Sequence, residues 1–186
     1  AMNPSEKTYF ETSVFTHAKN RFLWLLVLML SAAITGAIIT KYENAFSAIP
    51  LLVSFIPMLM DTGGNCGSQS STLIIRGLAL DEIRFKDIFK VIFKEFRIAL
   101  LVSLGLALAN GLRILITYKD LKLAIVIGLS LIATVILSKL IGCTLPLFAK
   151  KIHLDPAIMA APLITTLVDT CSIIIYFTIA THVFHL

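Results

Sequence analysis

Two carboxylates in this sequence lie where a membrane-spanning segment would be most apolar. Asp61 and Asp169 fall deep inside long apolar segments, whereas the other nine acidic residues lie in polar connections or near segment ends. A charged side chain at the centre of a bilayer costs about 2.5–3.5 kcal/mol on insertion scales, so such residues typically mark the path of an ion or proton. Asp61 and Asp169 are therefore candidate ligands of a transported cation.

Each aspartate has polar neighbours at helical spacing. Asn65 and Gln69 follow Asp61 at positions i+4 and i+8, which places the three side chains on one helix face. A second stripe, spaced i, i+4, i+7 and i+11, consists of Thr165, Asp169, Ser172 and Tyr176. Oxygen ligands of this kind favour hard cations over Zn²⁺ or Cu⁺, but they do not choose among Mg²⁺, Mn²⁺, Co²⁺ and Ca²⁺. The two stripes predict a wet path for a divalent cation.

The segment between the first aspartate and its polar neighbours is rich in residues that alter a helix. Pro57 removes one helix hydrogen bond, and Gly63 and Gly64 allow the backbone to depart from a regular helix. Carbonyl groups freed in this way would face a cation or its waters, so Gly64 is a further candidate ligand. The spacing of Gly63 and Gly67 also fits close helix packing, and the two roles are compatible.

The composition indicates which elements hold these residues. Hydrophobic residues make up 58% of the chain and charged residues 15%, and the mean hydropathy is +0.92, which is too apolar for a soluble domain. The apolar residues form long runs, and a spanning helix needs about 20 of them. We predict an all-α polytopic membrane protein with five transmembrane helices, at about 22–40, 46–75, 98–117, 121–149 and 156–183. The predicted division is an N-terminal cytoplasmic segment or interfacial helix over 1–21 and a transmembrane pore domain over 22–186.

The predicted ends of the spans give the depth of both carboxylates. At about 1.5 Å per helical residue, Asp61 lies roughly 22 Å and Asp169 roughly 21 Å into the membrane. Both therefore fall near the middle of the bilayer.

The basic residues predict the orientation of the chain. Eleven of the sixteen lie in the N-terminal segment or in the second and fourth connections, and four lie on the other side. This bias predicts a plasma-membrane protein with a cytoplasmic N-terminus and an extracytoplasmic C-terminus. The same topology explains the net charge of +5, so we expect membrane lipid and no nucleic acid among the partners.

The second connection has an amphipathic pattern. Apolar residues recur at helical spacing among basic ones, namely Ile88, Phe89, Ile92, Phe93 and Phe96. The pattern predicts an amphipathic helix on the cytoplasmic face between the second and third spans, and residues 8–20 favour a shorter helix of the same kind. Lys139 lies inside the fourth span, and we expect it to extend toward the cytoplasm or to pair with an acid.

Two stretches of the sequence resemble a known family. "DTGGNCGSQSSTLIIRGLAL" and "LDPAIMAAPLITTLVDTCSIIIYF" are similar to the membrane domain of the MgtE family of magnesium channels and transporters, and the resemblance runs from about residue 12 to the C-terminus. It implies a homodimer of five-span subunits, with a pore at the interface lined by the second and fifth spans. It also implies that Asp169 is the central Mg²⁺ site and that Asn65 lines the pore, whereas the role of Asp61 rests on its depth alone.

The resemblance also concerns domain content. Family members often carry a cytoplasmic N domain and paired CBS modules ahead of the membrane part, whereas about 20 residues precede the first predicted span here. The sequence leaves open whether the chain is a fragment or a short relative.

Three functional readings compete. The first is a divalent cation channel or transporter that carries Mg²⁺, and the second is a proton- or sodium-coupled secondary transporter or exporter that uses the same aspartates. The third is a non-conducting membrane assembly subunit. An enzyme is not expected, because the sequence contains no HExxH, no GxSxG and no paired Ser/His or Cys/His within its spans.

Overall fold

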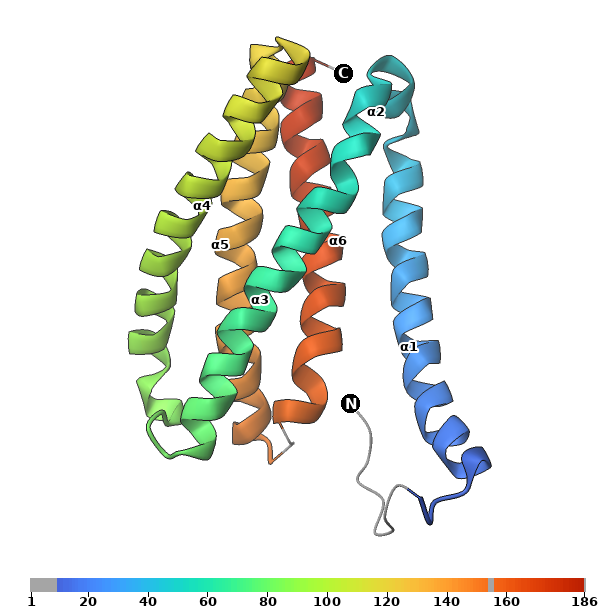
Figure 1. The fold of residues 1–186 in the computed structure, drawn as a ribbon, viewed down its shortest axis with the longest axis vertical. Helices are drawn as coiled ribbons and strands as arrows, with labels where there is room; N and C mark the ends of the chain where they lie inside the picture. The colour runs from blue at the N-terminus through green and yellow to red at the C-terminus, as the bar shows by residue number, and fades with distance from the viewer. Residues whose placement is uncertain (1–9, 154–155, 186) are drawn as a thin grey trace.

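The computed structural model describes residues 10–153 and 156–185, and within these residues it contains helices and short connections but no strand. The helices follow one another along the chain in an up-and-down arrangement (Figure 1). They are α1 (Val14–Lys41), α2 (Glu43–Ala48), the 3₁₀ helix η1 (Pro50–Phe55), α3 (Ile56–Ala79), the 3₁₀ helix η2 (Phe85–Asp87), α4 (Ile88–Tyr118), α5 (Leu121–Lys151) and α6 (Pro156–Phe184). The all-α prediction is confirmed for the described part of the chain.

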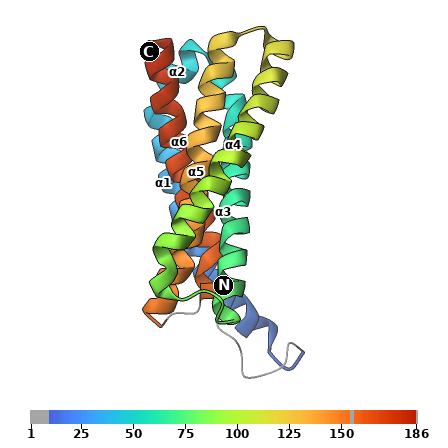
Figure 2. The ribbon, with the colours of Figure 1, turned by 90° about the vertical axis from the view of Figure 1, so that its left-hand side faces the viewer.

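Three long helices form the centre of the bundle. α3, α5 and α6 all pack against one another, and α3 crosses the other two obliquely (Figure 1). α4 packs mainly on α5, and α1 packs mainly on α6, so these two helices lie at opposite edges of the molecule (Figures 1 and 2). In the described part of the chain, α3 packs on α5 and α6 with one side and has exposed residues on the other.

Two apolar clusters hold the ends of the bundle together. Near the C-terminal end of α6, Leu52 and Phe55 of η1 are buried with Phe177 of α6. At the opposite end, beside the turn from α3 to α4, the buried cluster consists of Ile74, Leu78, Val91, Cys143 and Leu147. Burial of such side chains is the main stabilising term in folding, and it fixes the relative position of α3, α4 and α5.

The described part of the chain contains three helices that are long and apolar enough to cross a membrane. They are Phe85–Tyr118, Leu121–Lys151 and Leu163–Phe184. α1 contributes the shorter apolar stretch Leu25–Lys41, while α3 falls outside this set because of the glycine, asparagine, glutamine and serine residues in its middle. The chain is therefore a helical membrane protein, with three spans supported by length and composition.

The prediction of a separate interfacial helix between the second and third spans was wrong. α4 runs without interruption from Ile88 to Tyr118, because the sequence has neither glycine nor proline between residues 85 and 104 to end a helix. The aromatic residues that suggested a surface helix do face outward, with Phe89 82% and Phe93 64% exposed. The opposite face of the same turns carries Val91 and Glu95, which are buried.

The predicted N-terminal helix over 8–20 is also not a separate element. α1 begins after Ser13, whose Oγ accepts a hydrogen bond from the Thr16 amide at 3.2 Å. The helix then continues through residues 21 and 22, where the sequence suggested a boundary. Residues 1–9 lie outside the described part of the chain, so the domain division itself stays a prediction.

Candidate functional site

α3 has two faces of different character. One face, called the open face below, carries Asp61, Asn65 and Gln69, which are exposed, as their spacing predicts. The opposite face carries small and polar residues that are buried, namely Gly63, Gly64, Gly67, Ser70 and Ser71. A helix rotates by about 100° per residue, so both faces occupy the same turns of α3.

The buried face allows α3 to approach its neighbours closely. A Cβ atom on Gly63 would lie 2.7 Å from Val168 Cγ1 of α6 and 2.9 Å from Thr134 Cγ2 of α5. A Cβ atom on Gly67 would lie 2.6 Å from Ile164 Cγ2 of α6. A side chain at either position would force its neighbours on α5 or α6 to shift, which confirms the packing role that the sequence suggested.

The glycines do not unwind the helix, and the prediction of an irregular backbone at Gly63 and Gly64 was wrong. α3 is a regular helix from Ile56 to Ala79, and no described glycine has a positive φ angle. The missing side chains are used for contact between helices, so the backbone keeps its helical hydrogen bonds. Gly64 is buried against α6, where an added Cβ would lie 3.3 Å from Thr165 Cγ2.

The predicted polar stripe of α6 divides into two parts. Thr165 and Asp169 are half-buried, Thr165 against Gly64 of α3 and Asp169 among α1, α3 and α6. Ser172 and Tyr176 are fully buried, and the Tyr176 hydroxyl donates a hydrogen bond to the Leu52 carbonyl at 2.8 Å. The prediction of a continuous wet path along this stripe was therefore wrong, because Ser172 and Tyr176 face the interior of the helix bundle.

Two hollows lie beside these residues. One of about 640 Å³ runs along α3 and is lined by Asn65, Ser68, Gln69, Thr72 and Leu73. The other, of about 250 Å³, lies among α1, α3 and α6 and includes Met60, Thr166 and Asp169 in its lining. The structure thus separates Asn65 and Gln69 from Asp169 within one chain.

The two aspartates are close enough to affect one another. The Asp61 carboxylate exerts an electrostatic repulsion on that of Asp169. Within the described residues, however, no three His, Cys, Asp or Glu side chains converge into a metal-binding group. One chain therefore brings two carboxylates close to one another, without a third acidic, histidine or cysteine side chain beside them in the described residues.

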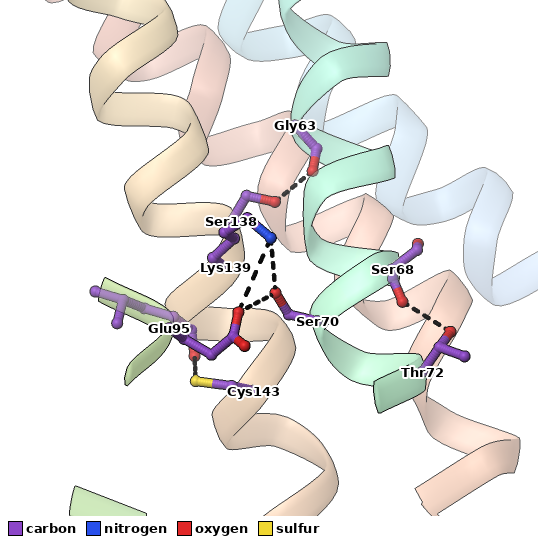
Figure 3. Close-up of polar contacts among 9 residues, drawn as sticks. Gly63, Ser68, Ser70, Thr72, Glu95, Ser138, Lys139 and Cys143 are labelled. Carbon is purple, nitrogen blue, oxygen red and sulfur yellow. Dashed lines mark hydrogen bonds and ion pairs between the residues drawn. The ribbon is translucent and has the colours of Figure 1, made fainter. Parts of the chain in front are cut away.

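A further charged residue was missed by the sequence reasoning. Glu95 of α4 is buried and lies 3.9 Å from Lys139 of α5, measured from Oε2 to Nζ (Figure 3). The expectation that Lys139 pairs with an acid is confirmed. The signal for Glu95 was its spacing, because Val91, Glu95 and Ala99 follow at intervals of four once α4 is taken as continuous.

The comparisons with known proteins bear on these features together. The sequence model of the MgtE family, described as "Divalent cation transporter", matches residues 56–179, which include α3, α4, α5 and most of α6. The chain belongs to the MgtE family. The resemblance seen in the sequence is thereby confirmed, and an MgtE protein is an ion transporter rather than an enzyme.

Individual MgtE relatives are similar over most of this chain. It is 36% identical to the magnesium transporter MgtE of Bacillus subtilis over 176 residues, which cover 95% of the chain and 39% of that protein. It is 35% identical to the magnesium transporter MgtE of Thermus thermophilus over 160 residues, covering 86% of the chain and 35% of the relative. The corresponding protein of Enterococcus faecalis is 32% identical over 167 residues, covering 88% and 36%. The chain thus spans little more than a third of the length of these relatives.

Proposed function

We propose that two copies of this chain form a path for Mg²⁺ across the membrane, lined by α3 and α6, with Asp169 as the central site. The observation that carries the proposal is the exposed polar face of α3, formed by Asp61, Asn65 and Gln69, with Asp61 close enough to the half-buried Asp169 of α6 to repel its carboxylate. The magnesium transporters named above are similar to this chain over the same helices. These features together favour a divalent cation as the transported substrate.

The second copy is inferred from the cost of exposing this face to lipid. Polar and charged groups at the depth of Asp61 and Asn65 need water or protein around them, because hydrocarbon offers no hydrogen bonds. A twofold axis beside α3 would bring the same face of a partner opposite to it, as is usual for a homodimer. It would also bring a second Asp61 and a second Asp169 to the path.

The proposed ligands suit a hydrated divalent ion. Mg²⁺ keeps several of its waters and is commonly held by one or two carboxylates. Two Asp169 carboxylates would attract the ion and would repel one another without it. Asn65, Gln69 and Thr165 would hold the outer waters, while Asp61 would extend the acidic site. Gly64 is not among these ligands, because its carbonyl lies in a regular, buried part of α3.

The topology follows from this arrangement. We propose five spans, because α1 and α3 join the three helices that are apolar enough on their own. α3 can cross the membrane since a partner covers its polar face. The N-terminus is then cytoplasmic, the C-terminus is extracytoplasmic, and residues 22–186 form the pore domain of a plasma-membrane protein.

Uptake of Mg²⁺ into liposomes that contain the purified chain tests the proposal. We expect uptake by the parent protein, and we expect Asp169→Asn to reduce it by at least a factor of about ten, which corresponds to about 1.4 kcal/mol of lost stabilisation of the ion in the pore. Asp81→Asn is a matched control, because Asp81 is exposed in the turn after α3 and has a positive φ angle that asparagine also adopts. Equal uptake by the parent and Asp169→Asn would remove Asp169 from the mechanism.

The same liposomes separate the competing functions. Uptake that continues without a proton or sodium gradient favours a channel, whereas uptake that requires such a gradient favours a coupled carrier. A folded parent protein with no uptake of any divalent cation would favour a non-conducting assembly subunit.

A further inference from the structure

Behind the open face of α3, one polar cluster joins three helices (Figure 3). The Ser70 hydroxyl of α3 donates a hydrogen bond to Glu95 Oε2 of α4 at 2.6 Å. Lys139 Nζ of α5 donates to the same hydroxyl at 3.2 Å. The side chains of Lys139 and Glu95 are only 6% and 7% exposed. Ser70 is thus the point at which α3 is bound to a buried ion pair.

Stability alone is a poor explanation for this cluster. Withdrawing two charges from water is costly, and replacing a buried ion pair with apolar side chains is often neutral or stabilising. A fully satisfied buried network does, however, favour one arrangement of the helices over its alternatives. Glu95 also has buried apolar residues one turn away on either side, Val91 and Ala99, and Cys143 lies close to it (Figure 3).

The cluster adds polar bonds between α3 and α4 to the apolar contact of Ile74, Leu78 and Val91. In the described part of the chain, α3 packs on α5 and α6 but makes few contacts with α4. The bond from Ser70 to Glu95 ties α3 to α4, and the bond from Lys139 ties it to α5 at the same point. About two turns earlier on α3, the Gly63 carbonyl accepts a hydrogen bond from the Ser138 hydroxyl of α5.

The direction in which the open face points depends on the rotation of α3 about its axis, and the hydrogen bonds of Ser70 restrict that rotation. Ser70 follows Gln69 directly, so its side chain leaves the helix about 100° away from that of Gln69. A rotation of α3 that moved Gln69 and Asn65 away from their hollow would also break both bonds of Ser70. The polar cluster therefore opposes rotation of the helix that carries the proposed ligands.

We propose that Ser70, Glu95 and Lys139 are positioning residues that fix the rotation of α3 and so present Asn65 and Gln69 to the transported ion. This role rests on the proposed function of the open face. The three residues do not touch the ion. They act through the orientation of α3.

The direct test measures the accessibility of residue 69. Cys66, Cys143 and Cys171 are replaced by alanine, Gln69→Cys is introduced, and the rate of modification by a positively charged thiol reagent is measured in membranes. We expect Ser70→Ala to lower this rate several-fold, because α3 can then turn. Ser71→Ala is the matched control, since Ser71 is the next residue, is also buried, and has a hydroxyl without a hydrogen-bond partner among the described residues. Equal rates in Ser70→Ala and Ser71→Ala would overturn the proposal.

A second measurement separates this inference from the proposed function. In liposomes, Ser70→Ala should raise the Mg²⁺ concentration that gives half-maximal uptake several-fold, whereas Ser71→Ala should leave it unchanged. Lys139→Arg, which keeps the charge and the donors, should resemble the parent protein. A change in modification rate with no uptake by the parent supports the positioning role and contradicts the Mg²⁺ path. Uptake by the parent and by Ser70→Ala with the same Mg²⁺ dependence contradicts the positioning role alone.

Discussion

The two faces of α3 carry similar polar residues in different surroundings. On the open face, Asn65 and Gln69 are exposed beside a hollow. On the opposite face, Ser70 is fully buried and bonded to Glu95 and Lys139. A buried polar side chain whose hydrogen bonds are made within the chain needs no role beyond packing. A polar side chain that is exposed within a membrane needs a partner protein, water or an ion. The surroundings of each polar residue therefore indicate whether its role is structural or functional.

The largest effect on stability is expected at the buried face. Lys139→Met leaves Glu95 buried without its counter-charge, which should lower the free energy of unfolding by about 3–5 kcal/mol. The double variant Lys139→Met with Glu95→Gln removes both charges and should recover most of this loss. Thermal unfolding in detergent checks both. Equal destabilisation by the single and double variants would contradict the pairing.

A smaller loss of stability is expected when the close contact between α3 and α5 is disturbed. A Cβ atom on Gly142 would collide with the Gly67 carbonyl oxygen, so Gly142→Ala has to move one helix away from the other. Overpacking of this kind typically costs about 1–3 kcal/mol. Gly105→Ala on α4 is the control, because an added Cβ there meets no atom within 4 Å. A Gly142→Ala variant as stable as Gly105→Ala would show that the helices are less close than the structure describes.

Substitutions on the open face should leave stability nearly unchanged and should reduce Mg²⁺ uptake. Asn65→Ala should change the free energy of unfolding by no more than about 0.5 kcal/mol, as is usual for exposed positions. It should lower Mg²⁺ uptake by roughly threefold to tenfold, since one hydrogen bond to a hydrated ion contributes about 0.5–1.5 kcal/mol. Asn110→Ala on α4 makes the same change away from α3 and α6, and it should leave uptake unaltered. If Asn65→Ala lowered the stability but left uptake unchanged, Asn65 would have a structural role like that of the buried face.

The smallest effect is expected at Asp61. Its side chain is exposed, so salt in the path screens its charge, and Asp61→Asn should reduce uptake only roughly twofold at low ionic strength. The difference from the parent should shrink as ionic strength rises. An effect as large as that of Asp169→Asn, or one that salt does not change, would indicate direct contact between Asp61 and the ion.

Much of the fold was predictable because the lengths of the apolar segments determine where the long helices lie. The fourth span was predicted at 121–149 and observed at Leu121–Lys151, where Asp120 accepts a hydrogen bond from the Leu123 amide and begins the helix. Helical spacing also predicted that Asp61, Asn65 and Gln69 share one face of α3, and all three are exposed there, while their role as ligands stays a prediction. These features depend on local sequence, so a single chain reveals them.

The errors came from features that depend on neighbouring helices. Phe89 and Phe93 suggested a surface helix, although the sequence contained no residue that would end α4 between them and the third span. Glu95 was placed in a connection because its partner Lys139 lies 44 positions away. Tyr176 shared a helix face with Asp169, but its hydroxyl bonds to the Leu52 carbonyl in the interior. Only the packing of several helices decides which polar side chains are satisfied.

The central claim is that the open face of α3 meets a second copy of the chain across the ion path. Disulfide cross-linking in native membranes tests it most directly, with Asn65→Cys in a variant whose natural cysteines are replaced by alanine. Leu101→Cys is the control, because Leu101 is 76% exposed on α4 and would face lipid. The account predicts that Asn65→Cys forms a covalent dimer, that Mg²⁺ slows this reaction, and that Leu101→Cys stays monomeric. A dimer formed through Leu101→Cys but not through Asn65→Cys would contradict it.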